Sequence, residues 1–305
     1  MNKKYTYSEI NSLACNPGLF VSDCTEAYKN RIAEVAQGIF SNHNRKIVML
    51  AGPSSSGKTT TAKLFSEEIN KLGGKAYTVS LDDFYLPRSV QYPLDENGKP
   101  DFECVEALDL GLLHSSLQSL AVSGKADLPV FDFNTGERIN NAKTVELREN
   151  DVIIVEGLHA LNPAITETLD SSKLYKIYIS VSSRVYDANG DVLLSKRDLR
   201  LIRRTVRDYL FRSMPVERTL EIWGSVMRGE DKYLFPFENL ADIKINSFHP
   251  CEPCVFSEKA VGLLRDVGEG EFKEKADSLI DKLSLFENID YSVLPDDSLL
   301  REFTG

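Results

Sequence analysis

The sequence has few of the features that mark membrane or secreted proteins. Its longest apolar runs, such as Ile47–Ala51 and Val152–Val155, are far shorter than the roughly 18 residues that a membrane-spanning helix needs. The first residues include no apolar signal segment. The five cysteines, an odd number in a long chain, indicate no disulfide framework. We therefore expect a cytoplasmic protein without a membrane partner.

Positive charge is also scarce. The chain has 36 Lys and Arg residues against 46 Asp and Glu residues, a net charge of −10, which argues against nucleic acid as a partner. Segment 196–212 is the exception, because it contains seven basic residues and only two acidic ones. A local excess of positive charge in an acidic protein fits the binding of a polyphosphate.

Apolar residues are plentiful enough for a large core. With 42% hydrophobic and 27% charged residues, the chain suits one large α/β domain, or one domain with an appendage. Short apolar runs alternate with segments of helical periodicity, which predicts a parallel sheet covered by helices on both faces. We expect strands at 46–51, 75–80, 151–156, 174–181 and 241–246, a hairpin from 128–133 and 139–147, and helices at 25–40, 58–72, 105–122, 196–212, around Trp223 and at 257–286.

The segment Gly52–Thr59 fits the pattern Gly-x4-Gly-Lys-Ser/Thr and lies between an expected strand and an expected helix. Such a loop curls so that its backbone N–H groups and the positive end of the helix dipole face phosphate oxygens. Lys58 would reach the β- and γ-phosphates of ATP or GTP, and the Thr59 hydroxyl would bind Mg²⁺. A Ser- and Gly-rich turn that fits by chance is the alternative. The predicted nucleotide-binding residues of the loop are Gly52, Ser54, Ser55, Ser56, Gly57, Lys58, Thr59 and Thr60.

Acidic residues follow two of the expected strands. Asp82 and Asp83 come after the strand 75–80, and Glu156 ends the strand 151–156. In an open parallel sheet these strand ends meet at the edge where the phosphate loop lies. Asp82 or Asp83 could orient an acceptor hydroxyl and accept its proton, and Glu156 could hold the metal directly or through water. The alternatives are turn or N-cap aspartates and a glutamate that faces water.

Four arginines of the basic segment lie on one face of its expected helix, at spacings i, i+3, i+4 and i+7. They would close over the triphosphate as a lid, stabilise charge on the transferring phosphoryl group and exclude water. A solvated charged face is the alternative. We assign Arg200 and Arg204 to catalysis, together with Lys58 and Asp82, and Arg203 and Arg207 to nucleotide binding.

Together these segments resemble the uridine kinase and phosphoribulokinase family of P-loop kinases, over about residues 46–250. The resemblance implies a P-loop NTPase three-layer α/β sandwich with a five-stranded parallel core sheet, a small β-hairpin that shapes the acceptor pocket, and a helical lid at about 183–215. We divide the chain into a helical lead-in (1–45), a kinase domain (46–256) and a helical extension (257–305), whose last residues, 295–305, resemble the ending of a longer bacterial branch. The motifs that carry the resemblance are at 51–60, 80–85, 128–133, 155–157 and 200–208.

Carried over to this sequence, the resemblance implies that Asp82 is the general base and that Tyr85 belongs to the acceptor pocket. Glu106 falls where the family has a carboxylate that binds ribose hydroxyls, although a first-turn helix charge is the alternative. Nucleoside-phosphorylating members have a Tyr and a His at positions that align here with Phe131 and Gly136, so hydrogen bonds that specify a pyrimidine are missing. The predicted acceptor-site residues are Asp83, Tyr85, Glu106, Phe131 and Arg138.

We predict a kinase that uses Mg-ATP to phosphorylate a hydroxyl of a small molecule, with the 5′-hydroxyl of a nucleoside as the first candidate. A kinase of a non-nucleoside acceptor, such as a sugar phosphate, glycerate or a vitamin precursor, is one alternative. A nucleotide-binding regulator with slow ATPase activity is another. The sequence leaves the oligomeric state open and is compatible with a homo-oligomer.

Overall fold

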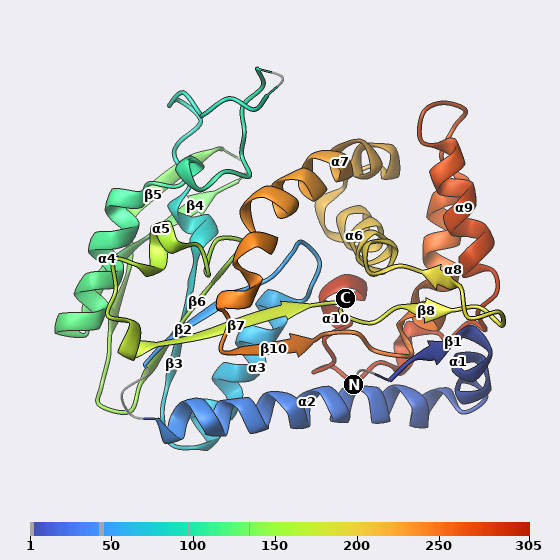
Figure 1. Ribbon diagram of the computed structural model, residues 1–305, viewed down its shortest axis with the longest axis horizontal. Coiled ribbons are helices and arrows are strands. Elements are labelled where there is room, and N and C mark those ends of the chain that lie inside the picture. Colours follow the sequence, from blue (N-terminus) through green and yellow to red (C-terminus); the bar gives the residue numbers. More distant parts are fainter. Residues whose placement is uncertain (1–2, 43–45, 97, 134) are drawn as a thin grey trace.

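The central sheet has five strands, all parallel, in the order β10–β7–β2–β6–β3 (Figure 1). The computed structural model describes residues 3–42, 46–96, 98–133 and 135–305. The predicted parallel core of five strands is confirmed, and each strand begins and ends within two residues of its expected bounds. The strands are β2 (Ile47–Ala51), β3 (Ala76–Ser80), β6 (Val152–Gly157), β7 (Leu174–Ser180) and β10 (Ile243–Asn246).

Helices cover both faces of this sheet (Figure 1). Successive residues of a strand point to opposite faces, so Val48 and Leu50 of β2 join one hydrophobic cluster while Ile47 and Met49 join the other. The first cluster includes α2, α3 and α8, and the second includes α4 and α5. The three-layer sandwich is therefore confirmed. The helices are α1 (Tyr7–Ala14), α2 (Pro17–Ser41), α3 (Lys58–Lys71), α4 (Leu110–Ser123), α5 (Pro163–Thr166), α6 (Lys196–Arg212), α7 (Val216–Tyr233), α8 (Glu252–Arg265), α9 (Lys273–Leu283) and α10 (Arg301–Thr304).

Helix α6 has the bounds of the basic segment. Ser195 caps its start, because the Ser195 Oγ accepts the N–H of Asp198 and the Asp198 carboxylate accepts the N–H of Ser195. Arg200, Arg203 and Arg204 of this helix are buried. These three arginines therefore do not form a solvated charged face.

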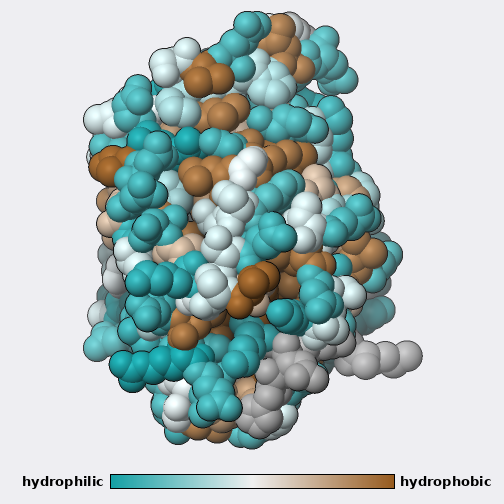
Figure 2. Space-filling model, turned by 90° about the vertical axis from the view of Figure 1, so that its left-hand side faces the viewer, coloured by the Kyte–Doolittle hydropathy of each residue, from teal (hydrophilic) through white to brown (hydrophobic). Residues whose placement is uncertain are grey.

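A separate hairpin, β4 (Lys125–Asp132) and β5 (Glu137–Glu146), lies on the α4 side of the sheet (Figure 1). It confirms the predicted pair of strands, although Asn134 in the expected turn lies outside the described residues. In Figure 2, hydrophobic residues on this side of the molecule lie in separate groups among hydrophilic ones. A further small sheet, absent from the predictions, joins β1 (Tyr5–Thr6), β8 (Val185–Tyr186) and β9 (Val192–Leu194).

Three predicted helices differ from the observed ones. The helix expected at 25–40 is α2, which begins at Pro17, because the Asn16 side chain accepts the N–H of Leu19 as an N-cap. The helix expected from residue 105 begins at Leu110, because the Asp109 carboxylate accepts the N–H of Leu112 as an N-cap. A short 3-10 turn, Val105–Ala107, precedes it. The expected tail helix is interrupted between α8 and α9, where Gly268 and Gly270 lie.

Both terminal segments pack into the main body of the protein. Ile32 of α2 and Phe303 of α10 belong to the same buried cluster as Phe65 of α3. In the view of Figure 1 the C-terminus lies near the middle, where α10 packs on α6. Within the described ranges, no helix has both the length and the apolar character that crossing a membrane requires.

Candidate active site

The loop between β2 and α3 has the backbone form of a phosphate cradle. Ser55 and Gly57 have positive φ angles of 59° and 89°. At Gly52, a Cβ atom would lie 2.3 Å from the carbonyl oxygen of Ile179 on the adjacent β7, so only glycine fits there. In such a loop, successive N–H groups can surround a phosphate.

The polar groups of this loop fit a ligand that is rich in acceptor oxygens. Lys58 Nζ donates hydrogen bonds to the carbonyl oxygens of Gly52 (2.9 Å) and Pro53 (3.2 Å), which hold the ammonium inside the loop. The buried hydroxyls of Ser55 and Ser56 have no hydrogen-bond partner among the described residues. Buried donors of this kind are satisfied in most proteins. Phosphate oxygens of a nucleotide could satisfy Ser55, which lines the cavity described below.

The ends of three strands meet beside the loop. Strand β6 lies between β2 and β3, so Glu156 of β6 is paired with Leu50 on one side and Ser80 on the other. As a result, Lys58, Asp82 and Glu156 line one cavity of about 220 Å³. Thr59 also lines this cavity.

Asp82 lies on the 3-10 turn Leu81–Phe84 that follows β3. Leu81 and Phe84 are buried and hold the turn against the sheet, whereas Asp82 faces the cavity and keeps contact with solvent. The surrounding protein atoms desolvate the Asp82 carboxyl and raise its pKa above the ordinary value, while the positive charge of Lys58 opposes this shift. A carboxylate with a raised pKa is suited to accept a proton.

Glu156 is buried at the end of β6 and accepts a hydrogen bond of 2.9 Å from Ser80 Oγ. Burial raises the pKa of its carboxyl, and Lys58 again opposes the shift. No group of three or more His, Cys, Asp or Glu side chains in the described part of the chain could hold a metal ion. Mg²⁺ in nucleotide sites, however, uses one or two protein ligands together with phosphate oxygens and water. Thr59 and Glu156 fit that ligand set.

Three arginines of α6 line the cavity: Arg204, Arg207 and Arg212. Their guanidinium nitrogens lie 3.2, 2.6 and 3.5 Å from the carboxylate of Asp208, which is fully buried. Arg204 Nη1 also donates to Ser54 Oγ in the loop at 2.6 Å. One carboxylate thus holds three guanidinium groups together on one side of the cavity, where they can contact the oxygens of a polyphosphate.

Arg200 and Arg203 support the loop from behind and are not among the residues that line the cavity. Arg200 Nη1 donates to the carbonyl oxygen of Ser54 at 3.0 Å, and Arg203 Nη1 donates to that of Ser55 at 3.3 Å. Each arginine is also paired with a buried glutamate, Arg200 with Glu230 and Arg203 with Glu252. The arginine face of α6 therefore divides into a group that holds the loop and a group that faces the cavity.

An aromatic group adjoins the cavity on the hairpin side. Tyr85 lines the cavity, and its ring centroid lies 5.8 Å from that of Phe131, which in turn lies 5.0 Å from that of Phe133. The backbone N–H of Phe131 donates to Asp83 Oδ1 at 3.2 Å. Asp83 thus fixes the hairpin beside Asp82 instead of lining the cavity.

The remaining predicted acceptor residues lie away from the cavity. Glu106 is exposed, because the turn Val105–Ala107 buries Val105 and Ala107 and directs the residue between them outward. Glu103 lines the cavity instead, and burial raises the pKa of its carboxyl to about 7. Arg138 is paired with Asp109, the N-cap of α4, at 2.9 Å.

Gly136, one of the two departures from the nucleoside-kinase pattern, has a positive φ of 73°. A Cβ atom at this position would lie 2.2 Å from Cδ of Arg88, and Arg88 Nη2 also donates to the carbonyl oxygen of Phe133 at 3.0 Å. Arg88 therefore occupies the space into which a side chain at position 136 would extend. The sequence pattern alone gave no sign of this contact.

The sequence predictions missed four charged residues that line the cavity: Glu103, Arg212, Glu230 and Glu302. Arg212 lies four residues after Asp208, a helical spacing that could have indicated it. Glu103 is in the same acidic segment as Glu106, and spacing does not tell the two apart. Glu230 and Glu302 lie far along the chain, and no sequence signal connects them with the loop.

Comparisons with known proteins show which family this chain resembles. A model of the phosphoribulokinase / uridine kinase family matches residues 47–252. The uridine kinase of Staphylococcus haemolyticus (strain JCSC1435) is 28% identical over 204 residues, which are 66% of this chain and 87% of that protein. The uridine kinase of Staphylococcus aureus (strain JH9) is 28% identical over 201 residues, 65% of this chain and 86% of that protein.

The fold has a counterpart among solved structures. A protein from Silicibacter sp. TM1040, described as a proposed fructose transport system kinase, has a TM-score of 0.50 at 19% identity, over 70% of this chain and 98% of that one. At this identity the likeness concerns the fold alone. Because the family model matches more than half of the chain, the protein belongs to the phosphoribulokinase / uridine kinase family of small-molecule kinases.

Proposed function

We propose that this protein transfers the γ-phosphoryl group of ATP to a hydroxyl of a small molecule, with a nucleoside as the first candidate acceptor. The observation that carries the proposal is the cavity in which Asp82 and Lys58 both lie, with three arginines beside them. A general base, a phosphate-binding lysine and arginines that contact the phosphate oxygens are what phosphoryl transfer to an alcohol requires.

In the proposed reaction, Asp82 orients the acceptor hydroxyl and accepts its proton as the oxygen attacks the γ-phosphorus. A bond forms between the acceptor oxygen and the γ-phosphorus, the bond from the γ-phosphorus to the bridging oxygen breaks, and ADP leaves. Lys58 and the cavity arginines Arg204, Arg207 and Arg212 stabilise the negative charge as it moves to the ADP oxygen. Mg²⁺, held by Thr59 and Glu156, would neutralise part of the phosphate charge.

The acceptor side of the cavity supports a nucleoside. The Glu103 carboxylate has two oxygens that can accept hydrogen bonds from vicinal ribose hydroxyls. The ring of Tyr85, which packs on the buried ring of Phe131, offers a flat surface to a base. The staphylococcal relatives are uridine kinases. We therefore assign Glu103, in place of Glu106, to the ribose hydroxyls.

One observation favours a second candidate, a kinase of a non-nucleoside acceptor. Position 131 is a phenylalanine, and Arg88 packs against Gly136, so neither position supplies a polar group to a pyrimidine. A site without such groups discriminates weakly among bases. The hydroxyls of a small polyol or sugar phosphate could still donate hydrogen bonds to Asp82 and Glu103.

The test is an ADP-release assay with Mg-ATP over a panel of nucleosides, sugar phosphates, glycerate and small alcohols. We expect one or a few acceptors to raise ADP release well above basal hydrolysis, and mass spectrometry to find the phosphorylated acceptor. Asp82→Asn is the control and should abolish the stimulation. A flat response across the panel would favour the nucleotide-binding regulator. Stimulation by sugar phosphates alone would favour the second candidate.

A further inference from the structure

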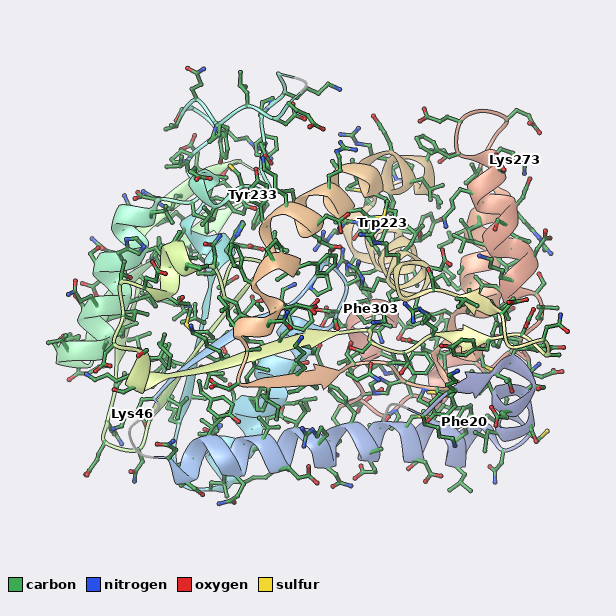
Figure 3. The ribbon with its side chains drawn as sticks, in the orientation of Figure 1. Phe20, Lys46, Trp223, Tyr233, Lys273 and Phe303 are labelled. Atoms are coloured by element: carbon green, nitrogen blue, oxygen red, sulfur yellow. The ribbon has the colours of Figure 1, made fainter. Side chains whose placement is uncertain are left out.

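The C-terminal segment, residues 294–305, is built into the interior of the protein next to the phosphate loop. Ser298, Leu299, Leu300 and Phe303 are each 1% exposed or less. Figure 3 shows Phe303 near the centre of the molecule. These four side chains are thus as buried as those of a core strand.

Several contacts fix this segment to the groups that hold the nucleotide loop. A Cβ atom at Gly57 would lie 2.7 Å from Cδ1 of Leu299, so Leu299 packs directly on the loop. The Phe303 ring lies 5.1 Å from the guanidinium carbon of Arg203, the arginine that binds the carbonyl oxygen of Ser55. At the outer end, Asp297 forms a salt bridge of 2.7 Å with Lys29 of α2.

The same segment brings a carboxylate to the start of α3. Glu302 Oε2 accepts a hydrogen bond of 3.1 Å from the backbone N–H of Thr60. The first hydrogen bond inside α3 runs from Thr61 N to Gly57 O, so the N–H of Thr60 has no acceptor within the helix. Glu302 also lines the cavity, together with Lys58 and Arg212. An acidic side chain therefore takes up a donor that the helix start offers to phosphate.

We propose that Glu302 sets the nucleotide affinity of this protein, because its carboxylate competes with nucleotide phosphate for the N–H of Thr60. The two anions cannot share one donor, and their like charges repel each other. When a phosphate binds, the Glu302 side chain turns away while Leu299, Leu300 and Phe303 keep the backbone of the segment in place. Nucleotide binding therefore includes the cost of displacing this carboxylate. The inference rests on the proposed function of the loop as the site for ATP.

The test compares wild type with Glu302→Gln and Glu302→Ala. Isothermal titration calorimetry gives the Kd of ATP, ADP, tripolyphosphate and adenosine, each with Mg²⁺ and with EDTA. We expect both variants to bind ATP, ADP and tripolyphosphate at least about threefold more tightly than wild type, with and without the metal. Adenosine, which carries no phosphate, should bind with unchanged affinity. Glu269→Gln, an exposed residue with the same loss of charge, is the matched control and should match wild type.

Unchanged or weaker binding of tripolyphosphate by both variants, with wild-type thermal unfolding, would overturn the proposal. Weaker binding of ATP only in the presence of Mg²⁺ would also overturn it and would make Glu302 a metal-site residue. Amide hydrogen exchange over residues 298–304 should stay slow when ATP binds to wild type; faster exchange would mean that the whole segment undocks, contrary to the proposal. A wild-type protein that binds no nucleotide at all would instead refute the proposed function.

Discussion

The guanidinium of Arg200 and the carboxylate of Glu230 form two parallel hydrogen bonds, of 2.6 and 2.7 Å, behind the phosphate loop. Both side chains are almost fully buried, at 3% and 0% exposed. Glu230 also accepts the backbone N–H of Ser54 at 2.8 Å, and Arg200 binds the carbonyl oxygen of the same residue. The pair thus connects α6, α7 and the loop. The ring centroid of Trp223 of α7, labelled in Figure 3, lies 5.3 Å from the guanidinium carbon of Arg200.

Glu230→Gln should strongly destabilise the protein. Removal of one partner leaves the Arg200 charge buried without compensation, which costs about 3–5 kcal/mol of unfolding free energy. Chemical denaturation measures this value. Glu221→Gln in the same helix removes the partner of Arg218, and both of these side chains are 57% exposed. This change should lower the free energy of unfolding by less than about 1 kcal/mol. Equal losses for the two variants would contradict the importance of the buried pair.

Asp82→Asn should lower kcat by about 10²- to 10⁴-fold, because the amide cannot accept the proton of the acceptor hydroxyl. The Kd of ATP should stay close to that of wild type, as calorimetry can check. Asp83→Asn is the neighbouring control, since its amide oxygen can still accept the N–H of Phe131. Near-normal turnover by Asp82→Asn would remove Asp82 from the reaction.

Glu156→Gln should raise the Mg²⁺ concentration for half-maximal activity by roughly tenfold or more, as for other weakened metal sites. In the proposed metal site the Glu156 carboxylate supplies a negative charge to the ion, and an amide replaces it with a neutral group. Activity measured over a Mg²⁺ titration gives the result. Glu167→Gln, at an exposed position, should leave the titration curve unchanged. An unchanged curve for Glu156→Gln would mean that the residue does not serve the metal.

Glu103 should make stability depend on pH. Burial raises the pKa of its carboxyl from 4.5 to about 7, so the folded protein binds more protons than the unfolded chain between these values. The contribution of protonated Glu103 to the free energy of unfolding is fully present below pH 4.5 and is lost as the pH rises to about 7. The free energy of unfolding of Glu103→Gln should therefore increase relative to that of wild type between pH 5 and pH 8.

Denaturation of both proteins at about pH 5 and about pH 8 measures this difference. Glu106→Gln, three residues away and exposed, is the control and should track wild type at both values. Glu103→Gln should also raise the KM of the acceptor, because its neutral amide is a weaker hydrogen-bond acceptor for hydroxyls. A constant difference in stability at both pH values would show that Glu103 ionises as freely as an exposed residue.

Local sequence was enough to predict the sheet and the cradle. The run Ile47–Ala51 is apolar throughout, as a strand buried on both faces requires. The glycines at 52 and 57 allow the backbone of the loop to curl. Both features depend only on residues that are close together in the sequence. The same holds for α6, whose Ser195 cap lies beside its basic residues. The alternation of strands and helices then allows only a few topologies, because crossover connections between parallel strands are right-handed.

Only the tertiary structure decided which charged residues reach the cavity. Arg200 and Arg204 are four residues apart on one helix, yet the first binds Glu230 behind the loop and the second faces the cavity. Glu103 lines the cavity and Glu106 does not, because a 3-10 turn directs Glu106 outward. Glu302 lies 242 residues from Thr60, and only the packing of Leu299, Leu300 and Phe303 brings it there. Spacing along the chain fixes the phase of a helix or strand, whereas contacts between distant segments depend on how the whole core packs.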